Sequence, residues 1–223
     1  MPRMKRVAVG DTVYHFINRS NGRDTIFHTD KDYQHFESLL LEGIELINMR
    51  LLAYCIMPNH WHLTLYPRND RDLGEYMRWV TTTHVRQRRT QTKTVGHGHL
   101  YQGTYKSFPV AEDKHLHDLI RYIEQNPLRA GLTKKAEEWQ WSSLHRRLRN
   151  NLQDQKLLTS LPTDLSSNYL ESVNTIFDPE TLERIRHSIG KGTPYGAPSW
   201  VEQMIEKYHL ESTARGQGRP RRM

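Results

Sequence analysis

The strongest constraint on the fold is a pair of strand patterns separated by only two residues. Residues 50–57 form an apolar run, and residues 60–66 alternate between polar and apolar side chains as a half-buried strand does. Pro58 and Asn59 stand between the two segments and favour a turn. The two segments therefore predict a tight antiparallel hairpin.

Other segments of the first 126 residues alternate between strand and helix patterns. Strands are expected over 12–18 and 100–110, as the first and fourth of the sheet. Helices are expected over 31–47, 71–89 and 112–126. The fourth strand should bend at Gly103, and the third helix should end before Pro127. The order βαββαβ, followed by a helix, predicts an α+β, ferredoxin-like split βαβ sheet with the first and third strands at its centre.

Beyond residue 131 the patterns weaken. Residues 134–149 predict one or two short helices with a basic end, and further helical pieces are expected near 179–189 and 199–209. The last nine residues, RGQGRPRRM, are too polar to pack a core and predict a flexible basic tail. We therefore expect one packed domain over 1–131 and a helical extension with a basic tail over 132–223.

Composition narrows the classes of partner. The net charge of +7 and the pI near 9.5 point first to nucleic acid, although solubility alone explains a modest excess equally well. The single cysteine, Cys55, excludes an intrachain disulfide framework and fits a reducing cytosol. The longest apolar run is far too short to span a bilayer, and no secretory signal pattern is present. We expect a cytoplasmic protein with no membrane partner.

His60 and His62 form the first candidate site. They stand two apart on an expected strand, so both side chains leave the same face, with Cα atoms about 6.5–7 Å apart. Neutral imidazoles placed in this way can converge on one divalent ion, while Trp61 points to the opposite face, against the helices. An isolated pair of this kind is more often two satisfied polar residues on a partly exposed strand.

Two other histidine pairs fit a shared metal less well. His115 and His117 are also two apart, but on an expected helix, where their side chains point about 200° apart. His97 and His99 lie among glycines in an expected loop, which holds neither ring in a fixed direction.

The third helix carries a second candidate site. Leucine and isoleucine side chains form an apolar stripe that must face the core, and Asp118, Tyr122 and Asn126 form a separate row on its flank. Tyr122 and Asn126 can therefore point together into a cleft beside the sheet. The competing interpretation is a half-buried tyrosine and an ordinary asparagine at a helix end.

Three stretches together resemble one family. YCIMPNHWHLTLYP, LYQGTYKSFPV and YIEQNPLRAGL, at 54–67, 100–110 and 122–132, are similar to the REP-associated tyrosine transposases. These are relatives of the single-tyrosine insertion-sequence transposases in the HUH superfamily. WQWSS at 139–143, the stretch from GTPYG to LEST at 192–213 and GRPRR at 218–222 are also similar, so the resemblance spans nearly the whole chain in the family's order.

The resemblance implies a role for each candidate residue. Tyr122 matches the nucleophile, His60 and His62 match the metal-binding histidines, and Asn126 matches the polar residue that completes the metal site, where some relatives have Gln. Asp118 matches no residue with an assigned role. Mixed nitrogen and oxygen ligands suit Mg²⁺ or Mn²⁺, and Mn²⁺ tolerates nitrogen better. The implied product is a 5′-phosphotyrosine and a free 3′-OH.

The resemblance also implies a substrate, single-stranded DNA folded into the hairpin of a repetitive extragenic palindrome (REP). The chain offers three arginine groups as DNA contacts, although such groups are often only a solvated surface. They are Arg86, Arg88 and Arg89; Arg146, Arg147 and Arg149; and, in the tail, Arg215, Arg219, Arg221 and Arg222. The tail contains Gly-Arg-Pro, and flexible arms of this kind can lie in a minor groove.

Two functions compete after the resemblance is taken into account. One is a metal-dependent DNA endonuclease and strand-transferase, and the other is a domesticated hairpin-DNA-binding protein with little or no cleavage. The intact set of Tyr122, His60, His62 and Asn126 favours the enzyme. A hydrolase of small substrates is disfavoured by the basic tail and by the lack of an obvious paired carboxylate base. We expect a bacterial, nucleoid-associated protein; its oligomeric state is open, with a monomer slightly favoured.

Overall fold

The computed structural model describes residues 7–94, 96, 98–149 and 156–214. Its centre is a four-stranded antiparallel sheet of β1 (Val13–Arg19), β2 (Arg50–Met57), β3 (His60–Tyr66) and β4 (Lys106–Val110). The strand order is β2-β3-β1-β4, so the first and third strands are central, as expected from the sequence. The expected hairpin of β2 and β3 is confirmed, with Met57 paired to His60 across the turn.

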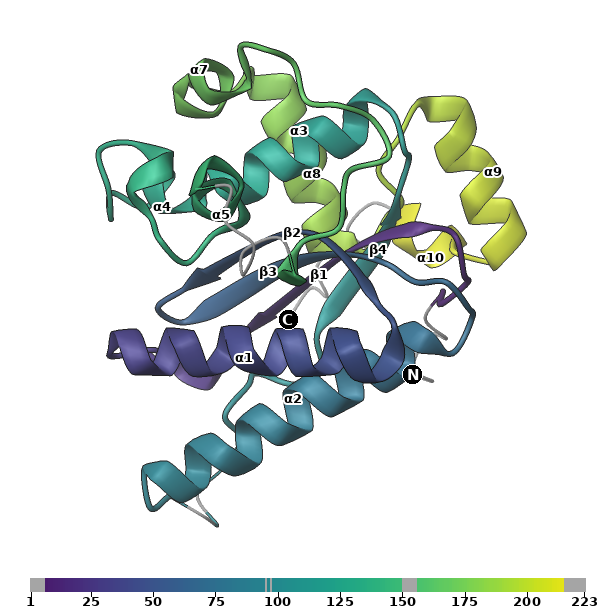
Figure 1. The fold of residues 1–223 in the computed structure, drawn as a ribbon. Helices are drawn as coiled ribbons and strands as arrows, with labels where there is room; N and C mark the ends of the chain where they lie inside the picture. Colours follow the sequence, from purple (N-terminus) through teal and green to yellow (C-terminus); the bar gives the residue numbers. More distant parts are fainter. Residues whose placement is uncertain (1–6, 95, 97, 150–155, 215–223) are drawn as a thin grey trace, which may run out of the picture.

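One face of the sheet is covered by the two helices that connect the strands. α1 (Asp30–Ile47) and α2 (Asp72–Gln91) lie side by side below the sheet in Figure 1. Gly43 permits this close approach, because a Cβ atom there would lie 2.9 Å from the Tyr76 ring. The odd-numbered residues of β3, including Trp61, face this layer and are fully buried in its core. The predicted direction of Trp61 is therefore confirmed.

The opposite face is covered by helices that follow the sheet in sequence. α3 (Lys114–Glu124) and α8 (Pro179–Lys191) lie above the sheet in Figure 1, with α4 (Asn126–Arg129), α5 (Ser143–Arg149) and α7 (Tyr169–Asn174) around them. The expected apolar stripe of α3 is completely buried; it consists of Leu116, Leu119, Ile120 and Ile123. α9 (Pro198–Tyr208) and the short α10 (Glu211–Ala214) follow, and two 3-10 turns occupy Asn21–Arg23 and Ala136–Glu138.

Residues beyond 131 pair with both edges of the sheet. The Ile56 amide of edge strand β2 donates to the Trp141 carbonyl at 2.9 Å, and the Thr159 amide donates to the Leu51 carbonyl at 2.8 Å. At the β4 edge, the Tyr195 amide donates to the Pro109 carbonyl at 3.0 Å. The extension thus satisfies backbone groups that an exposed edge would offer to other chains.

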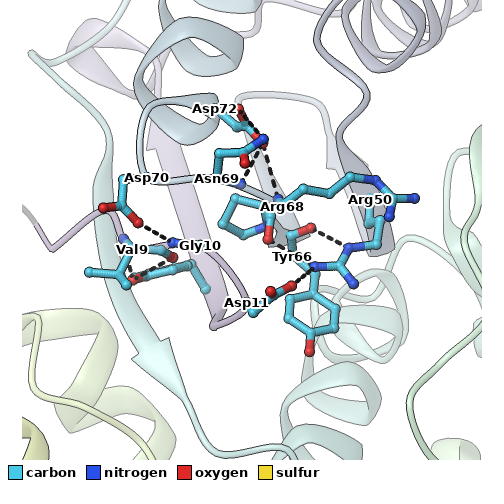
Figure 2. A network of polar contacts seen from close by, with 11 residues as sticks. Val9, Gly10, Asp11, Arg50, Tyr66, Arg68, Asn69, Asp70 and Asp72 are labelled. Carbon is cyan, nitrogen blue, oxygen red and sulfur yellow. Dashed lines mark hydrogen bonds and ion pairs between the residues drawn. The ribbon is translucent and has the colours of Figure 1, made fainter.

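The end of the sheet away from the β2–β3 turn is held by a polar network around Arg50 (Figure 2). Its guanidinium pairs with Asp11 at 2.6 Å, donates to the Tyr66 carbonyl at 2.9 Å and lies 3.5 Å from the centre of the Tyr66 ring. Nearby, the Gly10 amide donates to Asp70 at 2.9 Å. These contacts tie the N-terminal segment to the turn after β3, which leaves the other end of the sheet for the candidate site.

Two expected elements differ from the structure. The fourth strand begins only at Lys106, because Gly103 adopts a φ of 150° and the preceding segment makes a single bridge, from Tyr101 to Ser20. The third helix ends at Glu124, two residues earlier than expected, yet Pro127 does not stop helical structure. Proline is tolerated in the first turn of a helix, where its missing N–H is not needed, and it stands there in α4.

Candidate active site

His60 and His62 lie on the face of β3 that α3 covers. Their ring centroids are 5.2 Å apart, and the rings are inclined at 75°. His62 is 2% exposed, whereas His60, beside the turn, is partly exposed. The shared face predicted from strand alternation is therefore present.

Tyr122 approaches this pair from α3. It lies on the flank of the buried stripe and is 7% exposed, and its ring centroid is 6.1 Å from that of His62. Phe177 contacts the Tyr122 ring as well, with centroids 6.4 Å apart. Residues 60 positions apart in sequence are thus brought together between the sheet and the helix.

Asn126 lies one turn beyond Tyr122, but its amide group is engaged. Its Nδ2 donates to the carbonyls of Tyr122 and Ile123 at 3.1 and 3.2 Å, and its Oδ1 accepts from Arg129 Nη2 at 2.9 Å. The Arg129 guanidinium also lies 3.9 Å from the centre of the Tyr122 ring. A carbonyl oxygen has two lone pairs, so Oδ1 keeps one that a metal can use.

Three basic residues at this site were missed by the sequence analysis. His15, on β1, is fully buried, and its Nε2 lies 2.9 Å from His62 Nδ1. Arg19, at the end of β1, is the cross-strand partner of His60. Arg129 stands three residues after Asn126. Strand alternation in β1 and helical spacing after Asn126 indicate the directions of the His15 and Arg129 side chains. The residues that the two side chains contact are known only from the structure.

The histidines are held in their neutral form. Burial lowers the pKa of His60 from 6.5 to about 4, with further lowering from the charges of Arg19 and Arg129. Burial also lowers the pKa of His62 well below its usual value, and the neighbouring His15 contributes in the same direction. Neutral imidazole is the form that binds a metal, so these rings need lose no proton to do so at neutral pH.

The donor atoms fit a divalent metal with mixed ligands. His60 Nδ1 lies 2.7 Å from Asn59 Oδ1, and His62 Nδ1 is bonded to His15. Within the described segments, neither Nε2 atom has a hydrogen-bond partner. These two nitrogens and the Oδ1 atom of Asn126 are suitable ligands for a divalent metal ion. Among these same segments no group of three His, Cys, Asp or Glu side chains could hold a metal, so an all-histidine or carboxylate cage is not formed.

The other histidine pairs have separate partners. His115 Nδ1 lies 2.6 Å from Asp113 Oδ1, whereas His117 Nε2 lies 2.8 Å from the Thr163 hydroxyl. His99 is exposed in its loop, and His97 lies outside the described residues. Asp118 is partly buried, which raises the pKa of its carboxyl.

The arginine groups divide between exposed and engaged side chains. Arg86 is exposed on α2, but Arg88 pairs with Asp32 of α1 at 2.6 Å, and Arg89 donates to the Gly98 carbonyl at 2.8 Å. This places Arg88 in the packing of α1 against α2.

The second group divides in the same way. Arg149 is exposed, whereas Arg146 pairs with Glu37 and Arg147 donates to the Leu52 carbonyl and lies 3.5 Å from Glu124. Arg215, Arg219, Arg221 and Arg222 lie outside the described residues.

Comparison with known proteins identifies the family. The family described as "Transposase IS200 like" matches residues 8–126, which include both histidines, Tyr122 and Asn126. This chain belongs to the IS200-like transposases. Transposases of this family cleave DNA and generally use a divalent metal.

Two relatives of this IS200-like transposase carry names that agree with the resemblance. A Haemophilus influenzae protein, provisionally named a REP-associated tyrosine transposase, is 26% identical over 124 residues, or 52% of this chain and 70% of that protein. The REP-associated tyrosine transposase of Escherichia coli K12 is 23% identical over 138 residues, or 61% of this chain and 78% of that protein.

A solved structure supports the fold. The structure of a REP-associated tyrosine transposase bound to a REP hairpin aligns with a TM-score of 0.56 and 20% identity, covering 75% of this chain and 96% of that one. The α+β arrangement of a four-stranded antiparallel sheet and helices is therefore shared with it. No helix in the described part of the IS200-like transposase is long and apolar enough to cross a membrane.

Proposed function

We propose that this transposase is a metal-dependent, single-stranded DNA endonuclease and strand-transferase of the HUH type. Its substrate is a REP hairpin, its nucleophile is Tyr122, and its metal ligands are His60, His62 and Asn126. The observation that carries the proposal is the meeting of Tyr122 and His62, whose ring centroids are 6.1 Å apart although one lies on α3 and the other on β3. A ferredoxin-like split βαβ sheet, the finer form of the observed fold, supplies β3, and the helix that follows it is α3.

The chain's own groups account for a transesterification. Tyr122 Oη attacks the phosphorus, the bond to the 3′-oxygen breaks, and the phenol proton leaves while the 3′-oxygen becomes a hydroxyl. The product is a 5′-phosphotyrosine with a free 3′-OH. Attack by a 3′-OH on this ester reverses the step and rejoins strands. Arg129 stacks on the Tyr122 ring at 3.9 Å, limits its rotation and places positive charge beside the reacting groups.

His60 Nε2, His62 Nε2 and Asn126 Oδ1 are the atoms that would hold Mg²⁺ or Mn²⁺. When bound, the ion neutralises charge on the phosphate oxygens and orients the phosphorus for in-line attack. Because Asn126 Oδ1 also accepts from Arg129 at 2.9 Å, the arginine fixes the direction of the amide oxygen.

The substrate assignment rests on the relatives. The solved relative holds a REP hairpin, and two relatives bear the name REP-associated tyrosine transposase. In this proposal residues 1–131 carry the cleavage chemistry and residues 132–223 contribute DNA contacts. Of the six helix arginines predicted as DNA contacts, Arg86 and Arg149 are the exposed ones and remain the candidates. The tail arginines, Arg215, Arg219, Arg221 and Arg222, are further proposed DNA contacts.

The test is formation of a covalent adduct. Full-length protein is incubated with a labelled REP-hairpin oligonucleotide and Mn²⁺, and a labelled protein band is sought on a denaturing gel. We expect the band with the wild type, its loss with chelator, and its assignment to the peptide containing Tyr122 by mass spectrometry. Hairpin binding without any adduct would contradict the enzyme and favour a domesticated DNA-binding protein.

A further inference from the structure

The two metal-ligand candidates are oriented by different kinds of neighbour. His60 Nδ1 lies 2.7 Å from an amide oxygen, Asn59 Oδ1, which can only accept a hydrogen bond. His62 Nδ1 lies 2.9 Å from another imidazole nitrogen, His15 Nε2, which can donate or accept. The proton on His60 is therefore fixed at Nδ1, whereas the location of the proton on His62 depends on His15.

Only one of the two arrangements leaves His62 able to bind a metal. If His62 Nδ1–H donates to His15 Nε2, then His62 Nε2 carries a lone pair directed away from the strand. If His15 Nε2–H donates instead, the His62 proton sits on Nε2 and blocks that atom as a ligand. A neutral imidazole carries one proton, so the two outcomes exclude one another.

We propose that His15 is a positioning residue that accepts the Nδ1 proton of His62 and so keeps the Nε2 lone pair of His62 available for the divalent ion. This inference rests on the proposed function. In metal-binding histidines the second ring nitrogen usually donates to an acceptor that fixes the ring, and His15 fills that place from the neighbouring strand. It has no contact with substrate in this role.

The surroundings leave His62 no other acceptor at Nδ1. His15 is fully buried and His62 is 2% exposed, so bulk water does not reach the bond between them. The His15 ring is held on its other side by Phe108, with ring centroids 4.9 Å apart. No other hydrogen bond to His62 is formed by any residue the structure describes.

The far nitrogen of His15 can hold the remaining proton. His15 Nδ1 is buried without a hydrogen-bond partner, and so is the hydroxyl oxygen of Thr64. His15 and Thr64 are cross-strand partners in the β1–β3 register. Partners of this kind have Cβ atoms about 4.5–5.5 Å apart, so Thr64 lies on the same face of the sheet as His15, although no hydrogen bond joins its hydroxyl to His15 Nδ1.

The first experiment measures Mn²⁺ affinity of the full-length protein by calorimetry, without DNA. We expect His15→Leu to bind Mn²⁺ about 10- to 100-fold more weakly than wild type, the usual cost of losing such a second neighbour. His15→Gln offers an amide oxygen in place of Nε2 and should restore affinity to within about threefold of wild type. A folded His15→Leu protein with wild-type affinity, or a folded His15→Gln protein no better than His15→Leu, overturns the proposal.

His84→Leu is the matched control. His84 is also a buried histidine with one ring nitrogen hydrogen-bonded, 2.6 Å from the Tyr101 hydroxyl, but it lies on the other face of the sheet. Thermal melts will show whether both leucine variants lose similar stability. The Mn²⁺ affinity of His84→Leu should remain that of wild type; an equal loss in both leucine variants would mean that destabilisation, not positioning, weakens binding.

The second experiment needs no substitution. Ring-nitrogen chemical shifts of the ¹⁵N-labelled, metal-free wild type report which nitrogen of His62 carries the proton. We expect a protonated Nδ1 and an unprotonated Nε2 on His62. The opposite pattern overturns the proposal even if the variants fail to fold.

These readouts separate this inference from the proposed function. Wild-type protein that binds no Mn²⁺ overturns the proposed metal site and this inference together. Wild-type binding with an insensitive His15 overturns this inference alone. Tyrosine-adduct formation does not enter either measurement.

Discussion

Each face of β3 carries a chain of hydrogen-bonded polar side chains. We call the chain on the α1–α2 face closed, because none of its buried atoms lacks a partner among the described residues, and the chain on the α3 face open, because one does. On the α1–α2 face, Trp61 Nε1 donates to the Tyr101 hydroxyl at 2.9 Å, and that hydroxyl is bonded to His84 Nδ1 at 2.6 Å. On the α3 face, His62 is bonded to His15, and the chain ends at a His15 nitrogen with no hydrogen-bond partner among the described residues. Buried histidines occur on both faces, so burial alone does not distinguish a site from a core.

The difference lies in which atoms remain available. On the closed face, Tyr101 joins the indole and imidazole groups, and aromatic rings such as Phe27 stack on His84. On the open face, His15 Nδ1, Thr64 Oγ1 and Arg129 Nη1 are buried without a hydrogen-bond partner, and Tyr122 lies beside His62 with Arg129 over its ring. Buried polar atoms without partners cost stability, so their concentration at one place indicates a function that compensates for it.

The largest effect is expected from removing a proposed metal ligand on the open face. His60→Ala or His62→Ala removes a metal ligand and should lower the DNA cleavage rate by at least about 10³-fold, as should chelation of the metal. His84→Ala should instead lower stability and leave cleavage by the folded fraction unchanged. Cleavage at wild-type rate by His62→Ala would remove the distinction between the two faces.

Acid should destabilise the packing on both faces. Burial lowers the pKa of His15 to about 3 and that of His84 to about 3, from 6.5. The unfolded chain therefore takes up protons below pH 6.5 that the native protein does not, so stability is full above that pH and falls toward pH 3. Each histidine should contribute a slope of about 1.4 kcal/mol per pH unit.

Urea unfolding of the metal-free protein at pH 7, 6 and 5 measures this slope. His15→Gln and His84→Gln should each reduce the slope by about 1.4 kcal/mol per pH unit, because each removes one histidine whose pKa is lowered in the folded protein. A pH-independent unfolding free energy over this range would contradict neutral burial of both rings.

The strand order and the directions of the candidate site residues could be predicted from the sequence for physical reasons. Strand alternation separates Trp61 from His60 and His62, and helical spacing separates Tyr122 from the buried leucines. These are local periodicities, and each fixes a direction without tertiary information. The early end of α3 and the short β4 were not predicted, because each depends on backbone choices at one or two residues.

His15 and the divided arginines required the structure. The contact of His15 with His62 depends on the register of β1 against β3, which no local pattern in either strand reveals. Arg88 and Arg146 look like surface charges in the sequence but pair with Asp32 and Glu37 across tertiary contacts. Charge clusters in sequence therefore overestimate the number of side chains available to DNA.

The smallest expected effect concerns these arginines. Arg149→Ala should reduce the slope of log affinity against log salt for hairpin DNA by about 0.7–0.9 if the exposed side chain meets one phosphate. Arg146→Ala should mainly lower stability, because it removes the ion pair between Arg146 and the buried Glu37. Hairpin affinities at several salt concentrations, with urea unfolding of both variants, test this division; equal salt slopes for wild type and Arg149→Ala would contradict it.

The most direct test of the central claim compares one tyrosine from each face. Tyr122→Phe and Tyr101→Phe each remove a single hydroxyl, and both proteins are assayed for DNA adduct formation and for urea unfolding. We predict that Tyr122→Phe forms no adduct at near wild-type stability, whereas Tyr101→Phe loses about 1–3 kcal/mol of stability and still forms the adduct. An adduct of normal yield with Tyr122→Phe, or its loss with a folded Tyr101→Phe, would contradict the assignment of chemistry to the α3 face.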